Sequence, residues 1–118
     1  MRSGFLALVL CLAGSVGCAQ DMRPLSDLIS SSSNGYPFTR CSGYYQAMME
    51  WTGQERMGAE TWARFDSARE DLILTAALVL QSEAGKTFED SVSVVVRDVR
   101  NIADLYLARM ERNYAAVG

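Results

Sequence analysis

The chain has 118 residues, of which 49% are hydrophobic and 21% charged, and it contains two prolines. This length and composition are typical of one globular domain and exclude a disordered or fibrous chain. The formal net charge is −3 and Lys86 is the only lysine. The chain therefore lacks the clustered positive charge that binds nucleic acid or an anionic membrane surface, and we expect no nucleic-acid partner.

The sequence contains no histidine. This absence excludes Ser-His-Asp and Cys-His nucleophiles, His-ligated zinc and haem, and the di-iron site of carboxylate bundles. Carboxylates are the acid or base groups that remain, and Asp66 and Glu70 share a helix face, but Arg69 lies between them and indicates a solvated, salt-bridged surface. We expect no catalytic residue, cofactor or metal, and an enzyme that uses carboxylates is the weaker alternative.

Residues 1–19 have the pattern of a secretion signal. Arg2 precedes an apolar run from Phe5 to Ala13, and small residues follow up to Ala19. The run is roughly half of the ~20 apolar residues that a membrane-spanning helix needs. Cleavage after Ala19 would start the mature protein at Gln20, so we predict a periplasmic or secreted protein.

A second processing route is compatible with the same segment. Residues 15–18, Ser-Val-Gly-Cys, resemble a bacterial lipobox, in which Cys18 becomes a lipidated N-terminus. The segment departs from that pattern at Ser15, where leucine is usual. The alternative is therefore a lipoprotein anchored at Cys18, and we expect contact with a membrane in that case alone.

Residues 20–40 are predicted to form an N-terminal arm ahead of the bundle, which would occupy residues 41–118. Pro24 suits the first turn of a short helix over residues 24–30, in which Leu25 and Leu28 contribute to a small apolar face. The serines at 30–33 and Pro37 then favour a loop.

Three long helices are predicted after the arm. The first begins near Thr39 or Ser42 and ends near residues 53–58, and Tyr44 and Trp51 lie on one of its flanks. The second runs from about residue 59 to 84. Its main stripe is formed by Trp62, Phe65, Arg69, Leu72, Ala76 and Val79. Residues 72–80 are apolar nearly all round, which predicts burial on more than one side by neighbouring helices or a partner chain.

The third helix begins with a capping-box pattern at Thr87 and continues to about residue 115. Its apolar stripe is formed by Val92, Val95, Val99, Ile102, Tyr106 and Met110. Its polar side carries Asp90, Arg97, Asn101, Asp104 and Glu111. The sequence thus predicts an all-α fold, a small up-down helical bundle of three main helices with a short helix ahead of them.

The interaction surface is predicted at the aromatic residues Tyr44, Trp51 and Trp62. Cys41 has three interpretations: an inert core thiol packed with neighbouring side chains, a disulfide between two chains, or a bridge to Cys18 if that residue survives processing. We predict a non-enzymatic exported module that binds a protein partner or forms a homo-oligomer.

Overall fold

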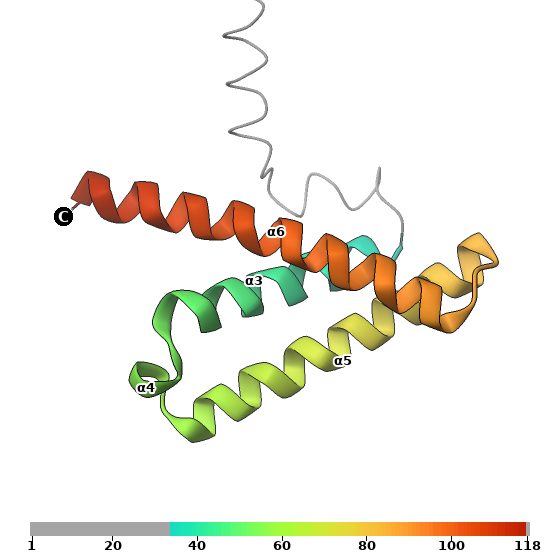
Figure 1. Ribbon diagram of the computed structural model, residues 1–118, viewed down its shortest axis with the longest axis horizontal. Coiled ribbons are helices and arrows are strands. Elements are labelled where there is room, and N and C mark those ends of the chain that lie inside the picture. Colours follow the sequence, from blue (N-terminus) through green and yellow to red (C-terminus); the bar gives the residue numbers. More distant parts are fainter. Residues whose placement is uncertain (1–33, 118) are drawn as a thin grey trace, which may run out of the picture.

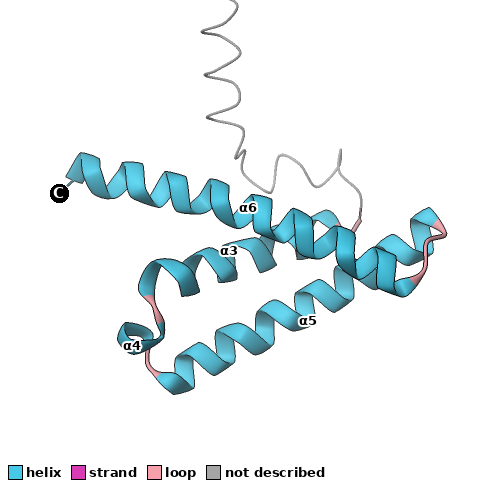
Figure 2. Cartoon of the chain, viewed as in Figure 1, coloured by secondary structure: helices cyan, strands magenta, loops and turns pink. Residues whose placement is uncertain are grey.

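The structure is a computed structural model that describes residues 34–117, and within that range it contains four helices and no strand (Figure 1, Figure 2). The helices are α3 (Tyr36–Thr52), α4 (Gln54–Met57), α5 (Ala59–Ala84) and α6 (Phe88–Val117). The predicted all-α bundle of three long helices is confirmed. The predicted signal peptide, Cys18 and the predicted helix at residues 24–30 lie outside the described residues.

The three long helices contact one another in every pairing. In Figure 1, α3 and α5 run side by side in opposite directions, and α6 crosses both of them. The single turn α4 connects the first two long helices at the end where α5 begins. The last turns of α6 extend past the end of α3, and residues 111–117 are all exposed.

Helix α3 begins at Tyr36, earlier than the predicted start at Thr39 or Ser42. Pro37 lies in its first turn, where a missing N–H costs nothing because the first N–H groups of a helix have no partner within it. The prediction treated this proline as part of a loop. Thr39 and Arg40 are both buried, so residues 36–40 of the predicted arm belong to the bundle.

Turns between the helices depend on glycine and threonine. Gly85 ends α5 in the left-handed conformation (φ 67°), and its N–H donates to the Gln81 carbonyl at 3.1 Å. At the start of α6, the Thr87 hydroxyl accepts the Asp90 N–H at 3.1 Å. The predicted helix cap at Thr87 is thereby confirmed.

The central core lies between α5 and α6. It consists of Ile73, Ala76, Ala77, Val95 and Val99. The predicted stripe of α6 is confirmed, because its middle members are buried and its outer members are half-buried. The predicted polar side of α6 is also confirmed, because all five of its residues are exposed.

The predicted stripe of α5 needs a correction. Leu72 is half-buried, whereas its neighbour Ile73 is 7% exposed and Ala77 is fully buried. The stripe member Ala76 is buried in the core together with Ile73 and Ala77, which pack against α6. The stripe member Arg69 contacts α3, where its carbonyl accepts the Ser42 hydroxyl, so α5 contacts two helices with different sides. A single stripe of period 3.6 describes one contact and misses the second.

Small residues let the helices approach closely. Five of the most deeply buried residues are Ser42, Ala47, Ala77, Ser91 and Ala103. A Cβ atom on Gly43 would lie 2.5 Å from Cγ2 of Ile102, so α3 and α6 touch at this glycine. The Ser42 hydroxyl donates to the Arg69 carbonyl of α5 at 3.0 Å, which satisfies a polar group in the same interface.

Candidate functional site

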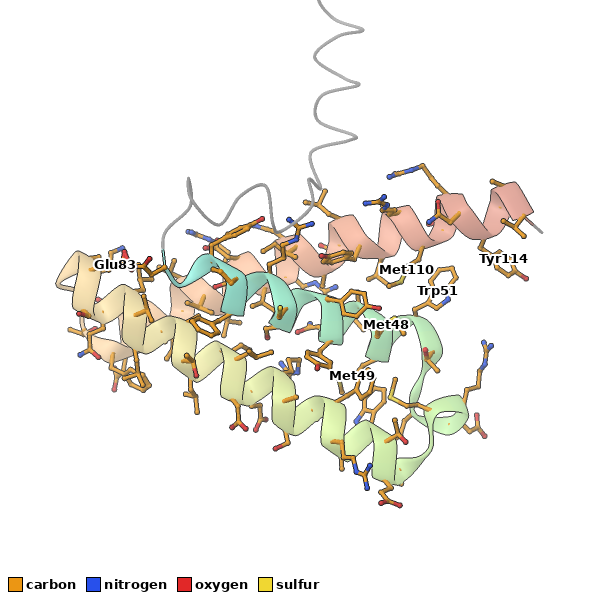
Figure 3. All side chains as sticks on the ribbon, turned by 180° about the vertical axis from the view of Figure 1, so that it is seen from behind. Met48, Met49, Trp51, Glu83, Met110 and Tyr114 are labelled. Carbon is orange, nitrogen blue, oxygen red and sulfur yellow. The ribbon has the colours of Figure 1, made fainter. Side chains whose placement is uncertain are left out.

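The predicted aromatic residues do not form one surface. Tyr44 is 44% and Trp51 41% exposed, and both contact rings of α6: Tyr44 lies 5.3 Å from Tyr106, and Trp51 lies 6.1 Å from Tyr114, between ring centroids. Figure 3 shows the Trp51 and Tyr114 side chains next to each other, with Met110 at the same end. Trp62 is half-buried elsewhere, in a hollow between α3 and α5 that Met49 also lines.

The structure instead brings together an aromatic cleft of about 260 Å³ that all three long helices line. We define the aromatic cleft by its lining residues: Arg40, Cys41, Tyr44, Tyr45, Met48, Phe65 and Tyr106. Edge-to-face ring pairs build its walls, with Tyr45 and Phe65 centroids 5.2 Å apart and Tyr44 and Tyr106 centroids 5.3 Å apart. The walls are therefore apolar and are held by contacts among four rings.

Cys41 lines the aromatic cleft together with Tyr45 and Met48. It is a free thiol and is half-buried rather than enclosed in the core. The bridge to Cys18 stays a prediction, because that residue lies outside the described range. Cys41 is thus a wall of the cleft whose thiol has partial access to solvent.

Arg40 lines the aromatic cleft and is only 5% exposed. Its Nε donates to the Tyr106 hydroxyl at 3.0 Å, and its guanidinium carbon lies 5.9 Å from the centroid of the same ring. Its Nη1 is buried without a hydrogen-bond partner, and no carboxylate among residues 34–117 forms an ion pair with it. It is a buried cation whose charge has no counter-charge in the described part of the chain.

The charge of Arg40 persists despite its burial. Burial acts to lower the pKa of Arg40, but the hydrogen bond to the Tyr106 hydroxyl and the nearby oxygens of Tyr106 and Tyr36 outweigh it and raise that pKa above its usual value. The group also sits in the first turns of α3, where the positive end of the helix dipole disfavours a cation. A negatively charged group beside Arg40 would therefore be stabilised by its guanidinium.

Several carboxylates outside the cleft form ion pairs with arginines. Arg69 pairs with Asp66 at 2.7 Å and reaches Glu70 at 4.0 Å, which confirms the predicted salt-bridged face. Arg100 binds both oxygens of Glu50, at 2.7 and 3.0 Å, and also pairs with Asp104, four residues on, at 2.7 Å. These hydrogen bonds from Arg100 lower the pKa of Glu50 and keep it ionised.

An exposed apolar surface lies on the α5–α6 hairpin. We call it the hairpin patch and define it by Leu74, Leu78 and Val96, whose exposed fractions are 45, 57 and 48%. Leu74 and Leu78 directly follow the core residues Ile73 and Ala77 in sequence, and Val96 follows Val95. In an antiparallel helix pair, the residue after a contact residue turns to the same side on both helices, so the patch occupies one side of the hairpin.

The other side of the hairpin is covered. A hollow of about 250 Å³ on that side is lined by the residues that precede the core contacts, such as Val79 and Val94, and by the beginning of α3 at Gly35 and Tyr36. Helix α3 thus covers one side of the hairpin and leaves the hairpin patch open within the described residues. The predicted burial of residues 72–80 on several sides is accordingly incomplete in one chain.

Comparisons with known proteins give no relative for this chain: no family model, curated protein or solved structure matches it. None of the described helices combines the length and apolar character needed to cross a membrane. Over residues 34–117, no group of three or more Cys, Asp or Glu side chains is arranged to hold a metal ion.

Sequence reasoning missed Arg40 as a site residue, although a signal was present. No acidic residue lies three or four positions from Arg40 on either side, so no helical neighbour could neutralise it. Phe65 and Tyr106 could not be assigned to the cleft in the same way, because their meeting with α3 depends on how the helices cross.

Proposed function

We propose that this protein is an exported, non-enzymatic helical module that associates with a second copy of itself through the hairpin patch. The observation that carries the proposal is the exposure of three large apolar side chains on one side of the α5–α6 hairpin, with fractions of 45 to 57%. Contiguous exposed apolar patches on a small domain mark interaction sites more often than isolated exposed residues do.

The surroundings of the hairpin patch favour a second copy as the partner. In an interface with two-fold symmetry, residues near the axis meet their own copies, so like charges there would repel. Around Leu78 the neighbours along the helix are uncharged, namely Thr75, Gln81 and Ser82. Charged residues lie at the far edges of the patch: Glu70 and Asp71 precede Leu74, and Arg97 and Arg100 follow Val96. Two patches can therefore meet around Leu78 without burying a charge, with the charged side chains at the rim.

The small size of the core gives a physical reason for association. Apart from Ile73 and Ile102, the buried apolar residues are mostly alanine and valine, so one chain removes little apolar surface from water. If two hairpins dock face to face, their four helices surround a shared core, which is the arrangement of a four-helix bundle. Stable dimers bury about 800 Å² per partner, which the patch and its rim together would have to supply.

Oligomeric state in solution tests this proposal. Sedimentation equilibrium of the mature chain should give twice the monomer mass, and Leu78→Glu should return it to the monomer because a charge would be buried at the patch centre. Thr61→Glu is the matched control: it adds the same charge to an exposed position on α5 away from the patch and should leave the dimer intact. Helical circular dichroism of both variants checks folding.

Several results would contradict the proposal. A monomer at high protein concentration would remove its basis, and a dimer that survives Leu78→Glu would place the interface elsewhere. A dimer that dissociates only under reductant would assign the association to a Cys41 disulfide instead.

Export is the second part of the proposal, and it is supported by residues 1–19 alone. Intact mass of the protein from the periplasmic or culture fraction should match a start at Gln20. Added acyl chains on Cys18 would support the lipid-anchored alternative, and retention of Met1 would exclude both routes.

A further inference from the structure

We propose that the aromatic cleft is a binding site for a small organic monocarboxylate with an aromatic body, whose carboxylate pairs with Arg40. The site is separate from the hairpin patch, because it is built on α3 and its neighbours Phe65 and Tyr106. Ligand binding at the aromatic cleft can therefore be tested independently of self-association.

The unsatisfied guanidinium carries the argument. Arginine has five N–H donors in a planar fork that matches a carboxylate. In Arg40 the Nε donor is used by Tyr106, while Nη1 is buried and unpartnered. A buried donor without a partner is destabilising, so its retention at 5% exposure points to a group that completes it.

Charge and shape select the class of anion. Among the described residues, Arg40 is the only cationic one that lines the cleft, so a single negative charge matches it, whereas a phosphate dianion would bring a charge that this lining does not balance. The remaining walls are rings, a thioether and a thiol, which favour an apolar body that can pack against ring edges and faces.

The size of the cleft limits the body of the ligand. Its volume is about 260 Å³, just below the ~300–1,000 Å³ of pockets that enclose drug-sized molecules. One aromatic ring on a short chain is of the right scale. Tyr44 is 44% exposed, so the part of the cleft wall that it forms is open to solvent.

The first experiment compares two probes on the unchanged mature protein: 3-phenylpropionate and its uncharged analogue 3-phenylpropionamide. Titration calorimetry should show that the acid binds at least tenfold more tightly than the amide, since the two differ only in the group that meets Arg40. Equal affinities, or no binding of the acid, would refute the proposal.

Substitutions then locate the site. Arg40→Met keeps the apolar stem and removes the charge, so it should reduce binding of the acid at least tenfold while the melting temperature without ligand stays equal or rises, as expected when a buried unpaired charge is removed. Arg112→Met removes an exposed charge from the end of α6 and should leave binding unchanged. A large fall in the melting temperature of Arg40→Met would show a structural role for Arg40 and contradict the proposal.

The competing occupant is a carboxylate of this chain. Asp21 and Asp27 lie outside the described residues, and either could supply the counter-charge. The double variant Asp21→Asn, Asp27→Asn distinguishes the two occupants. Unchanged affinity for 3-phenylpropionate supports an external ligand, whereas at least tenfold tighter binding would show that the chain fills its own cleft and would overturn the proposal.

Discussion

The contact between α3 and α6 at Gly43 makes a sharp prediction about stability. In an exposed helix interior, Gly→Ala stabilises by about 1 kcal/mol, because alanine loses less backbone entropy on folding. Here a Cβ atom would lie 2.5 Å from Cγ2 and 2.9 Å from Cβ of Ile102. We therefore expect Gly43→Ala to destabilise the protein, against its helix propensity.

The magnitude follows from the geometry of the clash. The Cβ atom of Ile102 is fixed to its backbone and cannot rotate away, so α3 and α6 must move apart. Overpacking of this kind costs about 1–3 kcal/mol, and subtraction of the propensity gain of about 1 kcal/mol leaves a net loss of about 0–2 kcal/mol. Because the closest approach is as short as 2.5 Å, we expect the upper half of this range, about 1–2 kcal/mol. For a domain of this size, that loss lowers the melting temperature by roughly 4–16 °C.

Thermal and urea unfolding, followed by circular dichroism, measure this loss, and a double-mutant cycle with Ile102→Ala identifies its cause. Ile102→Ala alone should cost about 2–5 kcal/mol, but it removes the atom that clashes. Gly43→Ala in that background should then cost at least ~0.5 kcal/mol less than in the parent. A more stable Gly43→Ala variant, or strictly additive effects, would refute the close contact.

Three further predictions follow from burial and charge. Ile73→Ala should lower stability by about 2–5 kcal/mol, whereas Leu74→Ala, one residue on and 45% exposed, should cost under ~1 kcal/mol in the same urea titration of the monomer. Folding lowers the pKa of Glu50, so the contribution of ionised Glu50 to stability is present at neutral pH and is lost as the pH falls through that lowered pKa. Glu50→Gln should therefore make stability less dependent on pH on the acid side, by at most ~1 kcal/mol because the ion pair with Arg100 is partly exposed. Half-buried Cys41 should react with a thiol reagent more slowly in the folded protein than in urea, and equal rates would argue against its packing in the cleft.

The helices themselves were largely predictable from the sequence. The stripe of α6 repeats at spacings of three and four over most of its length, and Val95, Val99 and Ile102 are buried as that pattern indicates. The cap at Thr87 and the glycine at position 85 fix where α6 begins and α5 ends. These features depend on neighbours within one or two turns, which is the range that periodicity describes.

The start of α3 and the core face of α5 were predicted wrongly for identifiable reasons. Pro37 was treated as a helix breaker, although proline in a first turn is compatible with a helix. Leu72 was placed on the main stripe of α5 and Ile73 was not, yet Ile73 is more deeply buried, because α5 divides its apolar residues between α3 and α6. Periodicity alone does not show how many neighbours a helix has.

The aromatic cleft was beyond sequence reasoning because three helices build it. Arg40 and Tyr106 are 66 positions apart in the chain yet share a hydrogen bond of 3.0 Å. Their meeting depends on the crossing of α3 and α6, which is set by the close approach at Gly43. A glycine followed by two tyrosines in one helix gives no sign of which distant ring will face them.

The small residues of the core and the aromatic cleft are two consequences of the same packing. Close contact at Gly43, Ala47 and Ala103 leaves no space between the helices for a tyrosine or phenylalanine ring. The rings of α3 and its neighbours therefore lie along the outer edges of the interfaces, where they contact one another edge to face and remain partly open to solvent. If Gly43→Ala forces α3 away from α6, the Arg40 to Tyr106 hydrogen bond should weaken with it, so this variant should bind 3-phenylpropionate less tightly at temperatures where it is still folded. Unchanged binding by a destabilised Gly43→Ala variant would show that the cleft does not depend on the α3–α6 contact.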